Sequence, residues 1–179
     1  AAGPNHLFWS AFRAACRSVK PDCWLFGEVT RAGDVLRAYA GRLDGCLDFG
    51  FCRSIRMLAA EKTPALALGQ FINQVAAGRR YYGPAAQIDF VLPAFLDNHD
   101  MNRFFFTAME SVSAQEAALR LLYLLPGAPI VYYGSERELS QRQSIHANHA
   151  LGFDEARLEV NWEDKEEHIS ATVVREMAA

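Results

Sequence analysis

The sequence predicts an α/β protein in which about four parallel strands alternate with helices, as in a partial (β/α)8 TIM barrel. Short, nearly continuous apolar runs such as Leu25-Phe26 and Ile130-Val131 are typical of strands that are covered on both faces. Helical segments separate these runs, and this alternation favours parallel strands joined by crossover helices. Polar residues follow the runs, and active sites gather at the corresponding strand ends of barrels.

The first half of the chain opens with a helix at 5–20, where apolar residues recur at helical spacing and Asn5 is placed to cap the first turn. The apolar run at 23–29 predicts a strand, with Gly27-Glu28 at its end. The segments that follow are a short helix at 33–40, a strand at 43–49, a helix at 51–61 broken at Pro64, and a helix at 65–77 that stops at Gly78.

The second half of the chain contains two further strands. The run IDFVLPAFL predicts a strand that leads directly into Asp97, Asn98, His99 and Asp100. The segments after it are a helix capped by Ser113, with Glu116 completing a capping box and Pro126-Gly127 closing it, a strand at 128–134, a polar irregular stretch at 135–164, and a last helix at 166–179.

The composition fits a single globular domain over 1–179, with 51% apolar and 22% charged residues. The net charge of -3 and the lack of any Lys/Arg block give no electrostatic support for nucleic-acid binding. No apolar run approaches the ~20 residues that a membrane span needs. A doubly wound nucleotide-binding fold typically has a glycine-rich phosphate-binding loop. Neither GxGxxG nor GxxxxGK occurs in this sequence, so the barrel is favoured.

The four cysteines, Cys16, Cys23, Cys46 and Cys52, form neither a CxxC pair nor a zinc-type spacing. Each lies among apolar neighbours, so they are predicted to be small buried thiols. Such thiols favour a reducing compartment, and we expect a cytoplasmic protein. The opening stretch AAGPNHLFW lacks the basic start and the apolar core of a signal peptide.

Two carboxylates at different strand ends indicate glycosidase chemistry. Partial burial at a strand end would raise the pKa of Glu28 and keep it protonated as a general acid. Asp100 would face the same cavity if the strands are parallel, and His99 could donate a hydrogen bond to a substrate hydroxyl. Glycoside hydrolysis uses two carboxylates in this way. Taken singly, a strand-end Glu is more often a surface group, Asn-His-Asp is more often a turn, and one His is too few for a metal site.

Four segments, in this order, resemble signatures of the α-amylase family of retaining glycoside hydrolases. They are FGEV at 26–29, LDGCLDFGF at 43–51, FLDNHDMNRF at 95–104 and PGAPIVYYGSE at 126–136. The resemblance covers nearly the whole chain and matches the fifth to eighth strands of the family's barrel. It implies that Glu28 is the general acid/base and that Asp100 stabilises the transition state and grips sugar hydroxyls.

The same resemblance implies an α-glucan or small α-glucoside as substrate, bound by His99, Asn98, Arg103 and Tyr133, with Arg103 positioning rather than reacting. No cofactor is expected. No metal is expected either, because the family's usual calcium ligands lie in stretches upstream of these segments. The stretch YYGSERELSQ departs from the family, which usually has apolar residues after the glutamate.

The family's nucleophile is an aspartate in a G-x-R-x-D stretch, and this sequence has no such stretch. We therefore expect the second half of a catalytic barrel, inactive by itself because double displacement needs the nucleophile. Open barrel edges predict a homodimer, swapped elements or aggregation. Two alternatives stay open: a non-catalytic half-barrel that binds sugar or assembles, and an unrelated doubly wound protein. The phenylalanines expected at the exposed edges are Phe49, Phe51, Phe104, Phe105 and Phe106.

Overall fold

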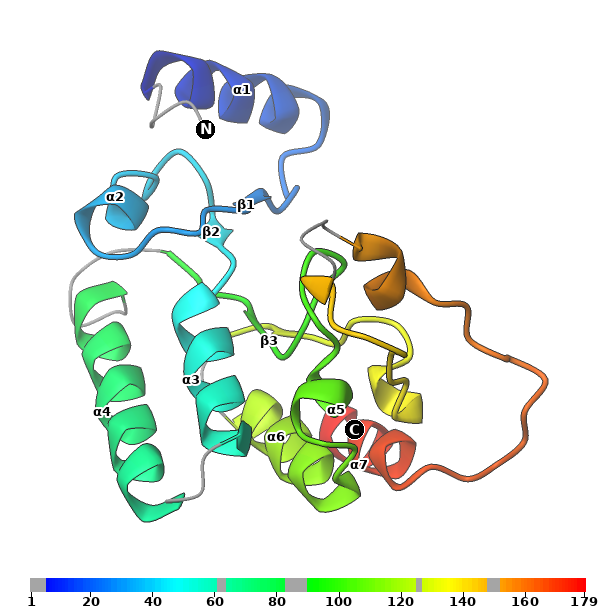
Figure 1. Ribbon diagram of the computed structural model, residues 1–179. Helices are drawn as coiled ribbons and strands as arrows, with labels where there is room; N and C mark the ends of the chain where they lie inside the picture. Colours follow the sequence, from blue (N-terminus) through cyan, green and yellow to red (C-terminus); the bar gives the residue numbers. More distant parts are fainter. Residues whose placement is uncertain (1–5, 61–63, 83–89, 125–126, 148–151) are drawn as a thin grey trace.

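The computed structural model describes residues 6–60, 64–82, 90–124, 127–147 and 152–179, and shows helices arranged around short strands (Figure 1). The predicted cap Asn5 and the helix-closing Pro126 lie outside the described residues. The helices are α1 (His6–Val19), α2 (Asp34–Arg37), α3 (Phe49–Ala60), α4 (Pro64–Tyr82), α5 (Phe104–Thr107), α6 (Val112–Leu124) and α7 (Ile169–Ala178), with 3-10 helices η2 (Ser135–Arg137) and η4 (Phe153–Arg157).

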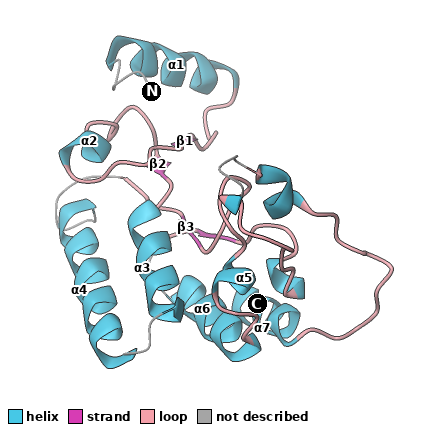
Figure 2. Cartoon of the chain, viewed as in Figure 1, coloured by secondary structure: helices cyan, strands magenta, loops and turns pink. Residues whose placement is uncertain are grey.

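In the described parts of the chain, four two-residue strands form two parallel pairs, which confirms the mixed α/β class with parallel strands. Figure 2 shows how short the strands are beside the helices. A bridge between Gly45 and Val91 links the two pairs, so the strands follow one another in chain order. The pairs are β1 (Phe26–Gly27) with β2 (Gly45–Cys46), and β3 (Ala94–Phe95) with β4 (Pro129–Ile130).

The strands are much shorter than the apolar runs that predicted them, and Pro93 accounts for one interruption. Cys46 N donates to Val91 O at 3.2 Å and Asp48 N donates to Pro93 O at 2.8 Å, but the proline nitrogen has no hydrogen to return. The backbones at Gly45 and Val91 also approach each other so closely that a Cβ on Gly45 would collide with the Val91 carbonyl oxygen. Hydrogen bonds therefore continue between the segments without forming a long regular ladder.

Two helix boundaries differ from the prediction. α4 does not stop at Gly78 but continues to Tyr82, whose buried ring lies 6.4 Å from that of Phe90. Burial of this ring offsets the ~1 kcal/mol that a glycine costs inside a helix. α6 is capped by Ser111 rather than Ser113, since the Ser111 hydroxyl accepts a hydrogen bond from Ala114 N at 3.3 Å.

The main core lies where α3, α4, α5, α6 and α7 pack together beside β3, and α6 and α7 lie against each other (Figure 1). A second core lies under α1 and α2, where Cys46 is fully buried. Burial raises the pKa of the Cys46 thiol to about 11 and that of the Cys52 thiol to about 12. These two cysteines are thus buried thiols as predicted, whereas Cys16 and Cys23 are only partly covered.

The predicted exposure of the phenylalanines is wrong for Phe49, Phe51 and Phe104, which are all buried. The reason is local: α3 begins at Phe49 and α5 begins at Phe104, so the chain turns into helices. These helices bring Phe51 and Phe104 into the main core and Phe49 into a smaller cluster with Cys52 and Phe95. Phe105 and Phe106 are partly buried. The exposed apolar surface lies elsewhere.

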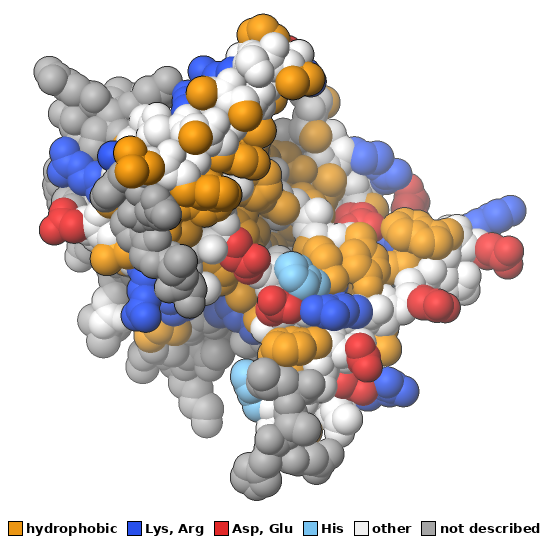
Figure 3. Space-filling view, turned by 90° about the horizontal axis from the view of Figure 1, so that it is seen from above, with side chains coloured by type: hydrophobic (Ala, Val, Ile, Leu, Met, Phe, Trp, Pro, Cys, Tyr) orange, Lys and Arg blue, Asp and Glu red, His pale blue; other side chains and the backbone are white. Residues whose placement is uncertain are grey.

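α1 carries that exposed apolar surface, and hydrophobic side chains gather over the end of the molecule where this helix lies (Figure 3). Leu7, Phe8 and Val19 are 85%, 54% and 86% exposed. The opposite face of α1 packs on the body through Trp9, whose ring lies 6.2 Å from that of Tyr39. One side of this amphipathic helix is therefore largely open to solvent.

None of the helices that the structure describes has the length and hydrophobicity needed to cross a membrane.

Candidate active site

The predicted site residues follow strands β1, β3 and β4, and the loop after β3 holds most of them. Asp97 is the second residue of this loop and is buried. Its carboxylate pairs with the Arg103 guanidinium (Oδ2 to Nε, 3.3 Å), and the two side chains are 2% and 0% exposed. Asp97 also accepts hydrogen bonds from Phe104 N at 2.7 Å and from the Ser135 hydroxyl at 3.0 Å. The loop is thereby tied to the start of α5 and to the segment after β4.

Arg103 continues this buried network towards the end of β4. Its Nη2 donates to Tyr133 O at 2.7 Å and to the Ser135 hydroxyl at 3.2 Å. The guanidinium lies 4.4 Å from the centre of the Tyr132 ring, which is a cation–π arrangement. Burial, together with the neighbouring Tyr133, raises the pKa of Tyr132 to about 12. Arg103 is enclosed by protein, so its contacts hold the loops in place.

Asn98 stands at the boundary between this buried layer and the solvent. Its Oδ1 accepts a hydrogen bond from Asp100 N at 2.9 Å, which is an Asx turn. Its Nδ2 is buried and has no hydrogen-bond partner among the described residues. The predicted turn is therefore real, and it leaves one amide donor of Asn98 to be satisfied by something else.

His99 and Asp100 lie at the surface end of the loop, with side chains 48% and 46% exposed. His99 Nε2 is 3.5 Å from Asp100 Oδ1, and the same oxygen accepts from Arg157 Nη2 at 2.8 Å. Arg157 also donates from Nε to His99 O at 3.1 Å. These contacts fix the backbone and the carboxylate while both side chains stay open to solvent.

Sequence reasoning missed Arg157 and a second pair of residues that support the loop. The amide of Gln141 accepts from Arg103 N and donates to Asn102 Oδ1 at 2.9 Å. Asn102 Oδ1 also accepts from Ile145 N at 2.8 Å. Arg157, Gln141 and Ile145 come from the irregular stretch after β4, where no periodic pattern marks a residue as close to the loop after β3.

Glu28 follows β1 and is exposed, so the partial burial predicted for it is wrong. β1 is the outer strand of its pair, and no strand of the described chain lies on its other side to cover the carboxylate. None of the hydrogen bonds or ion pairs of the described residues joins Glu28 to Asp100. The parallel strands nevertheless direct Glu28 and Asp100 to the same edge.

Tyr133 is partly buried, and its hydroxyl donates a hydrogen bond to Leu158 O at 3.0 Å. Its ring lies 4.6 Å from that of Tyr132. The side chain thus connects β4 with the later irregular segment. Metal-ligating side chains do not converge at the strand ends; in the described parts of the chain, they do so only at Asp164, Glu166 and His168.

These features define a parallel α/β protein whose strand ends present carboxylates and a histidine to solvent. Residues 2–173 match the family described as "Alpha amylase, catalytic domain", and the chain belongs to this family. The predicted family is therefore confirmed, and the chain is part of a hydrolase catalytic domain.

The similarity extends to individual relatives. The chain is 30% identical over 164 residues to Alpha-amylase 2 of Dictyoglomus thermophilum, covering 92% of this chain and 28% of that protein. The structure is similar to that of an Anoxybacillus α-amylase, with a TM-score of 0.71, 25% identity, and coverage of 96% of this chain and 35% of that one. A Geobacillus thermoleovorans α-amylase complexed with acarbose shares the fold at a TM-score of 0.71 and 24% identity, over 96% of this chain and 36% of that one. The chain thus spans about a third of the proteins that it matches.

Proposed function

We propose that this chain is the second half of an α-amylase-type catalytic barrel that cleaves α-glucosidic bonds by a retaining mechanism. The observation that carries the proposal is the loop after β3, where exposed His99 and Asp100 are held by Arg157 above the buried pair of Asp97 and Arg103. A catalytic carboxylate needs this combination of a fixed backbone and access to a ligand. Membership of the α-amylase family supports the reaction class.

Each strand-end residue has a role in this proposal. Glu28 is the general acid/base, and Asp100 stabilises the positive charge that develops on the sugar ring. His99 and the open amide donor of Asn98 bind sugar hydroxyls. Arg103 and Tyr133, whose polar groups are bonded to protein, position the site and do not contact the ligand directly.

The proposed substrates are starch-like oligosaccharides, polysaccharides or small α-glucosides. The complex of one structural relative with acarbose supports this choice. Retention also requires a nucleophile, and the sequence printed here contains no G-x-R-x-D stretch. We propose that turnover needs residues beyond these 179, and that this chain by itself binds sugar without cleaving it.

A protein that carries this segment together with its preceding barrel strands tests the proposal through hydrolysis of a maltooligosaccharide. We expect Glu28→Gln to lower kcat by more than about a thousandfold, because the leaving oxygen loses its proton donor. Asp100→Asn should lower kcat on the same scale. The exposed Glu159, changed to Gln, is the matched control and should leave kcat unchanged. Full activity in Glu28→Gln would refute the assignment.

A second candidate, a non-catalytic half-barrel that assembles with a second copy, is favoured by the apolar face of α1. In this case Glu28→Gln would leave sugar binding unaffected, and neither the unaltered protein nor the variant would hydrolyse the sugar. We also propose a reducing compartment for either function, since Cys16, Cys23, Cys46 and Cys52 are all free thiols.

A further inference from the structure

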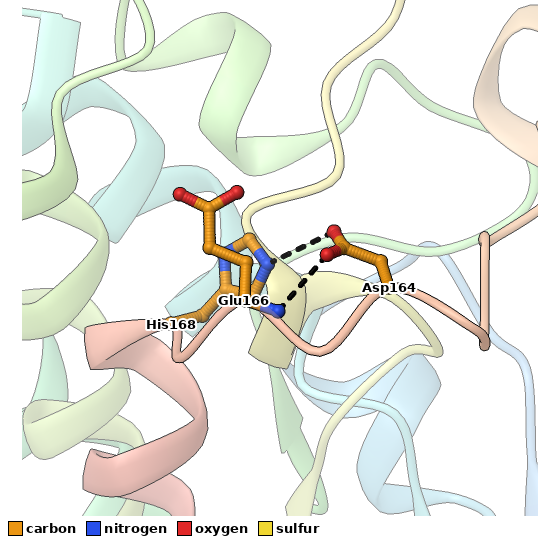
Figure 4. A group of neighbouring side chains, drawn as sticks. All are labelled: Asp164, Glu166 and His168. Atoms are coloured by element: carbon orange, nitrogen blue, oxygen red, sulfur yellow. Dashed lines mark hydrogen bonds and ion pairs between the residues drawn. The ribbon is translucent and has the colours of Figure 1, made fainter.

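We propose that Asp164, Glu166 and His168 form a binding site for a divalent cation of the zinc type, outside the candidate active site. One ligand atom from each of these side chains lies within 4.8 Å of the others. Figure 4 shows Asp164 directed towards the ring of His168, with Glu166 beside that ring. The proposal departs from the expectation, drawn from the sequence, that the chain holds no metal.

The spacing of the three residues explains why they meet. They stand at every second position of the irregular segment that leads into α7, and His168 has an extended backbone, with φ -85° and ψ 133°. In extended chain, alternate side chains lie on the same side. An Asx turn fixes the first ligand, because Asp164 Oδ1 accepts from Glu166 N at 2.9 Å. The backbone thus presents the three groups together.

His168 is oriented as a metal-binding histidine is. Its Nδ1 lies 3.1 Å from Glu138 Oε2, and Glu138 comes from the segment after η2, 30 positions away. Its other nitrogen, Nε2, lies 3.9 Å from Asp164 Oδ2. A neutral imidazole that donates from Nδ1 to Glu138 turns the lone pair of Nε2 towards Asp164. Metal-ligating histidines commonly donate their second ring N–H to a carboxylate in this way.

The local charge also favours a cation. Three carboxylates, those of Glu138, Asp164 and Glu166, surround the ring, and Arg137 is the one guanidinium close to them among the described residues. Arg137 Nη2 lies 3.4 Å from Asp164 Oδ2 and donates to Asp164 O at 2.8 Å. The bond to the main chain can persist while Oδ2 turns to a metal, so Arg137 does not close the site.

One imidazole and two carboxylates are a ligand set that zinc accepts, whereas calcium and magnesium prefer oxygen alone. Tetrahedral ligands at about 2 Å from zinc lie roughly 3.3 Å apart, which is close to the 3.9 Å between His168 and Asp164. A water molecule can supply the fourth ligand. Because Glu138 is also bonded to Ser170 N at 3.1 Å, a bound ion would fasten the start of α7 to the segment after η2.

Titration of this chain with Zn²⁺ alone, followed by isothermal calorimetry, tests the site. We expect one binding event, weakened at least about tenfold by His168→Ala, Asp164→Asn or Glu166→Gln. Glu138→Gln should weaken it about tenfold through loss of ring orientation. The matched controls are Glu167→Gln, one position out of register and exposed, and His146→Ala, an exposed histidine elsewhere.

Several results would overturn the site. The first is the absence of a saturable Zn²⁺ binding event. The others are an equal loss of Zn²⁺ affinity in Glu167→Gln and Glu166→Gln, and an equal loss of Zn²⁺ affinity in His146→Ala and His168→Ala. Co²⁺ bound in place of Zn²⁺ gives a second measurement, since its visible spectrum reports nitrogen and oxygen ligands. A spectrum that is unchanged in Glu166→Gln, a surface substitution that leaves the fold intact, also contradicts the three-residue site.

Discussion

Arg103 and Asp97 form the one ion pair in the described chain in which both partners are almost completely buried. Removing one member leaves the other charge buried without compensation, and this costs more than the pair itself contributes. We expect Arg103→Met to lower the free energy of unfolding by about 3–5 kcal/mol. Denaturant unfolding followed by circular dichroism measures this change.

The exposed Arg157 provides the control for this prediction, because its ion pair with Asp100 is open to solvent. Arg157→Ala should change the free energy of unfolding by at most about 1 kcal/mol. The double variant Asp97→Asn, Arg103→Met should recover part of the loss, since no unpaired charge remains. Equal losses for Arg103→Met and Arg157→Ala would contradict a role for burial.

The site residues show what a single sequence can and cannot reveal. His99 and Asp100 were predicted because an apolar run leads directly into them, and the run did form part of a parallel strand. Arg157, which bonds Asp100, and Gln141, which bonds Arg103, come from the irregular stretch after β4, 57 and 38 positions from these partners. Such contacts depend on tertiary packing, which neither local propensity nor spacing records.

At the level of elements, apolar periodicity located most helices and the centre of each strand. It overestimated strand length, because the backbone hydrogen bonds beyond each two-residue strand do not form a regular ladder. It also missed α5, since four residues are too few for a helical period to be recognised. Ser111 and Ser113 are equally suitable caps by residue type, and only the helix start at Val112 decides between them.

The docking of α1 depends on one carboxylate of the neighbouring segment. Asp44 pairs with Arg13 at 2.6 Å and with Arg17 at 2.8 Å, both from α1, and accepts a hydrogen bond from Leu25 N. Burial raises the pKa of Asp44, but the hydrogen bond from Leu25 and the two guanidinium groups outweigh it, so the pKa lies below its ordinary value.

A lowered folded-state pKa means that Asp44 contributes stability above its unfolded pKa of about 4 and loses it as the pH falls through the lower folded-state value. We expect α1 to loosen in this acidic range. Trp9 fluorescence reports the change once Trp24 and Trp162 are replaced by Phe. Asp44→Asn keeps an acceptor for Leu25 but has no charge. In this variant we expect α1 to be loosened already at neutral pH, so that Trp9 fluorescence shows no further change in the acidic range. The same acid step in Asp44→Asn would rule out Asp44 as its source.

At the scale of the whole molecule, α1 and the outer strand β1 lie at the same end of the molecule (Figure 1). Trp24, just before β1, and Phe26, the first residue of β1, are exposed there as well. An apolar surface of this kind is covered by protein in stable assemblies. In the complete barrel proposed above, further strands and helices would cover it.

Without those further strands and helices, the isolated chain has the same surface open to a second copy. We therefore expect light scattering to show a dimer or larger species whose proportion rises with concentration. Leu7→Ser with Val19→Ser should shift the chain towards monomer, because these two side chains of α1 are 85% and 86% exposed. Met109→Ser, at an exposed apolar residue elsewhere, is the control and should leave the distribution unchanged. A monodisperse monomer at all concentrations would show that this face needs no partner.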